Sequence, residues 1–85
     1  MKLPVIKNLL EFIEKNDEDF LIETTEVLEH LSDAKGLKDE ELEVIGEIMS
    51  NIFGALEVHQ AMQKGRPQKE ALNEFMQRVM GSIDK

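Results

Sequence analysis

The chain has 85 residues with 18 acidic and ten basic side chains, so its net charge is −8, and it contains no cysteine. This length predicts a single domain, 1–85, and 41% hydrophobic with 33% charged residues is typical of a globular domain, not of a disordered acidic tail. Without cysteine the chain can form no disulfide, thiolate metal site or cysteine nucleophile. The acidic excess and the absence of Trp and Tyr disfavour direct nucleic-acid binding.

Targeting and membrane signals are missing from the sequence pattern. Residues 1–8 hold no apolar run of the length of a signal peptide. The most apolar stretch, 44–58, is interrupted by Glu47 and Glu57 and is too polar to span a bilayer. We therefore expect a cytoplasmic protein that makes no membrane contact.

Proline, glycine and capping residues divide the chain into four predicted helices, over about residues 3–15, 17–34, 39–64 and 67–83. The first has Pro4 in its first turn, where proline is tolerated. One side of it is apolar at helical spacing, formed by Ile6, Leu9, Leu10 and Ile13 and widened by Val5 and Phe12.

The second helix is predicted to begin after Asn16, a residue type that caps helix N-termini well. Its predicted core face consists of Phe20, Leu21, Thr24, Val27, Leu28 and Leu31. Gly36 follows as the expected stop.

The third helix is the longest, starting near Lys38 or Asp39 and ending before Gly65. Its apolar residues cover well over half of its circumference: Leu42, Val44, Ile45, Ile48, Met49, Ile52, Phe53, Ala55, Leu56, Val58 and Met62. So wide an apolar face indicates a helix contacted on several sides. The fourth helix follows Pro67 and carries the apolar stripe Leu72, Phe75, Met76, Val79 and Ile83.

No segment alternates between apolar and polar residues as a strand does, so the predicted fold class is all-α. We expect a compact four-helix bundle or paired helical hairpins around a long central third helix. Each helix carries one phenylalanine (Phe12, Phe20, Phe53 and Phe75), and we expect all four to pack in the core. A chain this short buries a modest core, and the wide apolar face of the third helix makes a dimer a reasonable expectation.

Three small residues, Gly46, Ser50 and Gly54, lie four apart on the third helix. Glycine inside a helix is unfavourable by about 1 kcal/mol relative to alanine, so two of them call for a reason. Close approach of another helix would supply one. An intramolecular crossing, a homodimer contact and a groove for a partner protein all remain open.

The negative charge is concentrated between residues 11 and 47, which hold 14 acidic and three basic side chains, a net charge of −11. The outer face of the second helix is predicted to present Glu18, Glu23, Glu26, Glu29 and Asp33, with Ile22 as an apolar residue among them. This face either confers solubility, docks a basic protein, or mimics a nucleic acid.

His59 falls in the middle of the apolar arc of the third helix, where a packed, hydrogen-bonded core residue is expected. A ligand- or metal-binding bundle centred on His59 is the alternative. The Glu-x-x-His pattern of helical carboxylate sites is not met, because Val27 precedes His30 by three residues and Leu56 precedes His59 by three. No phosphate loop or nucleophile elbow is present, so we predict no catalytic residue, no metal ligand, no cofactor and no enzyme activity.

Three segments, Leu3–Lys7, Asp39–Glu47 and Gly54–His59, resemble a family of short, uncharacterised, all-helical bacterial proteins. The resemblance extends over nearly the whole chain and implies no activity or catalytic residue. It implies a helper or partner role beside thioredoxin and peroxiredoxin proteins, whose chemistry a chain without cysteine cannot perform itself.

These observations favour a non-catalytic, cytoplasmic protein-interaction module. We expect it to form a homodimer and to dock an unidentified partner of basic character through the acidic helical face.

Overall fold

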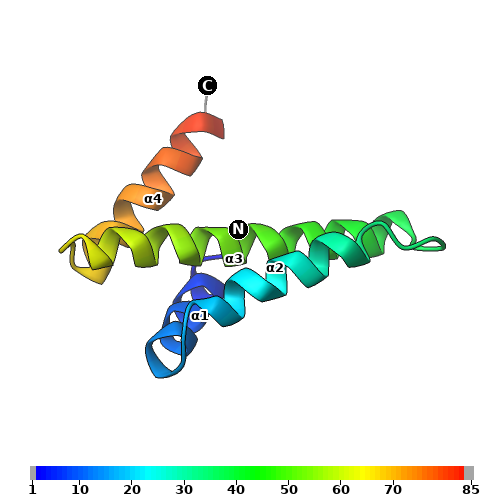
Figure 1. The fold of residues 1–85 in the computed structure, drawn as a ribbon. Helices are drawn as coiled ribbons and strands as arrows, with labels where there is room; N and C mark the ends of the chain where they lie inside the picture. The colour runs from blue at the N-terminus through cyan, green and yellow to red at the C-terminus, as the bar shows by residue number, and fades with distance from the viewer. Residues whose placement is uncertain (1, 84–85) are drawn as a thin grey trace.

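Residues 2–83 fold into four α-helices: α1 (Leu3–Lys15), α2 (Asp19–Leu31), α3 (Asp39–Gln63) and α4 (Gln68–Ile83) (Figure 1). This computed structural model describes residues 2–83, and the side chains of residues 2–79. No strand occurs within the described residues. The prediction of an all-α bundle with a long third helix is confirmed.

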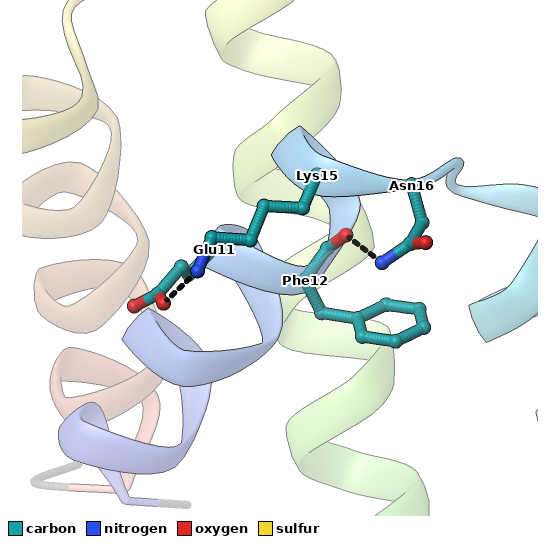
Figure 2. A network of polar contacts seen from close by, with 4 residues as sticks. All are labelled: Glu11, Phe12, Lys15 and Asn16. Carbon is teal, nitrogen blue, oxygen red and sulfur yellow. Dashed lines mark hydrogen bonds and ion pairs between the residues drawn. The ribbon is translucent and has the colours of Figure 1, made fainter.

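In the turn between α1 and α2, the role of Asn16 differs from the predicted one. Its backbone N–H donates to the carbonyl oxygen of Phe12 at 2.9 Å, and its side-chain amide donates to the same oxygen at 3.2 Å (Figure 2). Asn16 therefore closes the end of α1, and its prediction as the N-cap of the second helix was wrong. At the start of α2, a carboxylate oxygen of Asp17 accepts from the N–H of Asp19 at 3.2 Å.

Each of the two longer connections, 32–38 and 64–67, contains a glycine with a positive φ angle. Gly36 and Gly65 have φ angles of +90° and +105°, in the region that only glycine adopts without strain. The helix before Gly36 ends at Leu31, earlier than residue 34, because the N–H groups of Asp33 and Ala34 bond three residues back and tighten the chain into turns. At the start of α3, the Lys38 N–H donates to the Glu41 carboxylate at 2.9 Å.

Helix α3 is the centre of the molecule, because α1, α2 and α4 each pack on it and make few contacts with one another. The core is the set of apolar residues buried between these helices: Ile6, Leu10, Ile13, Leu21, Ile52, Ala55, Val58, Ala71, Leu72 and Phe75. Contact with three helices explains why the apolar face of α3 is so wide.

One buried polar residue fixes α1 on α3. The Asn51 side-chain oxygen accepts from the backbone N–H of Lys2 at 2.9 Å, and its amide donates to the carbonyl of Glu47 at 2.9 Å. Both polar ends of this buried side chain are therefore satisfied.

The burial pattern of α2 is rotated from the predicted one. Leu21 and Thr25 are buried and Leu28 is half-buried, whereas Val27 is 64% exposed. Phe20, Thr24 and Leu31, also predicted to face the core, are exposed as well. Leu21, Thr25 and Leu28 follow the same i, i+4, i+7 spacing as the predicted face, and α3 covers only one of these two adjacent stripes.

Phenylalanine burial was also predicted wrongly. Of the four rings only Phe75 is buried, while Phe12, Phe20 and Phe53 are exposed. A two-layer arrangement explains this result. The molecule measures 44 × 36 × 18 Å, and 18 Å is about the thickness of two helices of 10–12 Å each, so every helix keeps one side toward solvent.

Helix α2 runs alongside the N-terminal half of α3, and α4 projects from the C-terminal end of α3 (Figure 1). The radius of gyration is 13.9 Å. A typical domain of this length has a value of about 12 Å. Among the described residues, no helix combines the length and the apolar character needed to cross a membrane.

Candidate functional site

The outer face of α2 carries the acidic residues that the sequence singled out. Glu23, Glu26, Glu29 and Asp33 are exposed, and so is Ile22 among them. Glu23, Glu26 and Glu29 lie on this face because Leu21 and Thr25 turn another side of α2 toward α3, and Asp33 follows in the turn after the helix. Within residues 2–83 none of these four carboxylates takes part in an ion pair.

Glu18, the sixth residue of the predicted face, has a different environment. It is half-buried, and its carboxylate lies 3.7 Å from Nε2 of His59 on α3. His59 is half-buried too, so its expected place in the core was wrong. This contact brings the start of α2 against the C-terminal half of α3.

The small residues of α3 divide into two groups. A Cβ atom at Gly54 would lie 2.9 Å from Cζ of Phe75 and 3.3 Å from Cδ1 of Ile6, so α1 and α4 both approach this point closely. Gly46 has no such neighbour within 4 Å, and both Gly46 and Ser50 are exposed. Close packing inside the chain thus accounts for Gly54 alone, and a role of Gly46 and Ser50 in a dimer or partner contact stays a prediction.

A polar cleft of about 490 Å³ separates the C-terminal end of α3 from α4. Two of its three cations are paired across the cleft, Arg66 with Glu74 and Arg78 with Glu57 at 2.6 Å. The Arg78 guanidinium also lies over the Phe75 ring, 5.7 Å from its centroid. These pairs join α4 and the turn before it to one another and to α3.

On α1, Lys15 Nζ donates to the Glu11 carboxylate at 2.9 Å (Figure 2). This hydrogen bond, followed by the negative charge of Glu11, raises the pKa of Lys15 above its ordinary value of 10.5. The Phe12 ring leaves α1 on another side, away from this pair (Figure 2).

Metal ligands do not converge in the described part of the chain, where no three His, Asp or Glu side chains come close enough to share an ion. Around His59, the alternative centre, the carboxylate of Glu18 is the acidic group at ion-pair distance.

A set of exposed apolar side chains on α1, α2 and α3 was not predicted from the sequence. Phe20 and Val27 were assigned to the core, as were Val44 and Ile48, yet all four are exposed. The sequence did contain a sign of this exposure. Apolar residues cover more of the circumference of α2 and α3 than three or four packed helices can bury.

Comparison with known proteins gives a family and no function. A family of unknown function (DUF6952) matches residues 1–84. The chain belongs to this family. No curated protein and no solved structure matches it. Membership agrees with the resemblance to an uncharacterised family and assigns no activity to any residue.

Proposed function

We propose that this chain is a small, non-catalytic interaction module of the cytoplasm that binds a basic partner protein as a homodimer. The docking surface is the acidic outer face of α2. The observation that carries this proposal is the set of exposed carboxylates around Ile22, none of them in an ion pair within residues 2–83.

The chemistry of this face suits a protein ligand. An exposed apolar side chain surrounded by charge resembles the arrangement of interface hot spots, where a central anchor is desolvated and polar groups form the rim. Carboxylates such as Glu23 and Glu26 would steer a basic surface toward Ile22 and select against acidic ones. Docking on Ile22, Glu23, Glu26 and Glu29 would break no ion pair within the described residues.

A photo-crosslinking amino acid at position 22 tests the proposal in the native cell. We expect it to capture a protein with a basic surface, whereas the same amino acid at position 77, an exposed glutamine on α4, does not capture it. Glu23→Gln combined with Glu26→Gln should reduce the yield about tenfold, since steering depends on these charges. Equal capture from positions 22 and 77 would contradict the proposal.

A further inference from the structure

We propose that an apolar groove between α1 and α2, over the N-terminal half of α3, is the interface at which a second copy of this chain binds. The inference deepens the homodimeric part of the proposed function and assigns it a surface separate from the acidic face. We call this surface the α1–α2 groove. Its residues are Val5, Leu9, Phe12, Phe20, Val27, Leu31, Val44 and Ile48.

Three observations join these residues into one surface. Val5 and Leu9 of α1 line a hollow of about 310 Å³ together with Val44 and Ile48 of α3. Phe12, seven positions after Val5, lies on the same side of α1. Its ring meets Phe20 of α2 edge to face, with the centroids 5.7 Å apart.

The α2 side of the groove follows from this aromatic contact. Val27 and Leu31 lie seven and eleven positions after Phe20, so they share its side of the helix. From the turn that joins them, α1 and α2 diverge (Figure 1).

These apolar side chains are more exposed than expected for the surface of a soluble monomer. Val27 is 64% exposed, Val44 55% and Phe20 54%, and they are three of the eight apolar residues of one patch. Single exposed apolar residues are ordinary on soluble proteins, whereas a contiguous patch of this kind marks an interaction site.

Surface area argues for a second copy as the occupant. The chain exposes 6280 Å². A compact monomer of this mass exposes about 5,100 Å². The difference, about 1,200 Å², exceeds the roughly 800 Å² that each partner buries in a standard protein interface. Two copies in contact through the α1–α2 groove would remove the excess from water, as the large radius of gyration also suggests.

The charges at the groove fit a symmetric contact. The hollow between α1 and α3 is bordered by one cation, Lys2, and one anion, Glu47. A two-fold interface brings the same patch of two copies together, so it needs both signs within that patch. Lys2 of one copy can then meet Glu47 of the other, whereas a strongly basic partner would find little to pair with here.

A matched pair of variants tests the inference by light scattering on the full chain. The groove variant, Val44→Gln with Ile48→Gln, changes two residues of the α1–α2 groove. The control, Leu42→Gln with Phe53→Gln, changes two exposed apolar residues of the same helix, and Phe53 follows Val44 by nine positions, about two and a half turns, which puts it on the opposite side. Circular dichroism checks that both variants keep their helices.

We expect twice the chain mass of 9.7 kDa for the wild type and the control, and the monomer mass for the groove variant. A wild-type monomer at micromolar and higher concentrations overturns the inference. A dimer that survives in the groove variant and is lost in the control also overturns it, because the interface would then lie on another side of α3.

Thiol labelling supplies a second measurement if the groove variant fails to fold. The chain has no cysteine of its own, so Val27→Cys and Gln77→Cys each introduce a single thiol. Between dilute and concentrated protein, we expect labelling at position 27 to slow about tenfold by mass action and labelling at position 77 to stay constant. If the protein is a dimer and the thiol at position 27 is labelled at the same rate at both concentrations, the inference is overturned. Loss of photo-crosslinking at position 22 alone would overturn only the proposal that the acidic face docks a partner.

Discussion

At the residue scale, Gly54 shows how a single missing methyl group positions two helices. Its Cα faces the buried ring of Phe75 from α4 and the fully buried side chain of Ile6 from α1. Neither neighbour can move away without displacing other core residues, because protein interiors are close-packed. Gly46, two turns earlier on the same helix, faces open space.

Alanine at these two glycines should therefore have opposite effects. Gly46→Ala should stabilise the chain by about 0.5–1 kcal/mol through helix propensity alone. Gly54→Ala should destabilise it by about 1–2 kcal/mol, since overpacking outweighs the same propensity gain. Urea unfolding followed by circular dichroism measures both. Equal stabilisation by both substitutions would show that α4 and α1 do not approach α3 as closely as described.

The Glu11–Lys15 pair on α1 gives a prediction in pH. The hydrogen bond from Lys15 raises its pKa, so the pair stabilises the fold below the lysine pKa of the unfolded chain and this contribution is lost as the pH rises through the higher folded value. An NMR titration of Lys15 should show a midpoint above 10.5 that falls in Glu11→Gln. An unchanged midpoint in this variant would mean that the pair does not form in solution.

At the element scale, the sequence predicts where the helices lie better than which sides they bury. All four helices match within about three residues at their ends, because proline, glycine and charge patterns act locally. Burial is decided by neighbours. On α2 two adjacent stripes are apolar, and only the arrangement around α3 decides that Leu21 is covered and Val27 is not.

Asn51 fixes the position of α1 on α3 through its hydrogen bond to Lys2, and this role was not predicted from the sequence. The sequence does show that Asn51 is a polar residue inside the most apolar stretch of the longest helix, which indicates a buried amide. A buried amide there needs partners, and the structure provides them at Lys2 and Glu47. The sequence contains no information on which backbone group would be its long-range partner.

Asn51→Ala should loosen the start of α1. The Lys2 N–H would lose its acceptor, at a cost of about 1–2 kcal/mol in unfolding free energy. Hydrogen exchange at Val5 and Ile6, whose N–H groups bond to the Lys2 carbonyl at 3.1 Å, should become about tenfold faster if the first turn frays. The control is Asn8→Ala, at an exposed asparagine within α1. Similar exchange rates in both variants would assign the anchoring of α1 to apolar contacts alone.

At the scale of the whole molecule, the two proposed surfaces differ in their electrostatics. The hollow of the groove is lined by one cation, Lys2, one anion, Glu47, the amide of Asn51 and apolar side chains, whereas the acidic face presents the exposed carboxylates of Glu23, Glu26 and Glu29. Each copy carries −8 overall, so two copies repel one another at long range while a basic protein is attracted. Salt screens both interactions, with a Debye length of about 10 Å at 0.1 M.

Added salt should therefore shift the two equilibria in opposite directions. Between about 0.02 and 0.2 M NaCl, we expect the dimer dissociation constant to fall about threefold, because screening reduces the repulsion between like-charged copies. Over the same range the affinity for an oligolysine peptide, which stands in for a basic partner, should fall about tenfold. Analytical ultracentrifugation and fluorescence anisotropy measure the two constants. Self-association that weakens with salt would indicate a dimer held mainly by acid–base contacts and not by the apolar side chains of the α1–α2 groove.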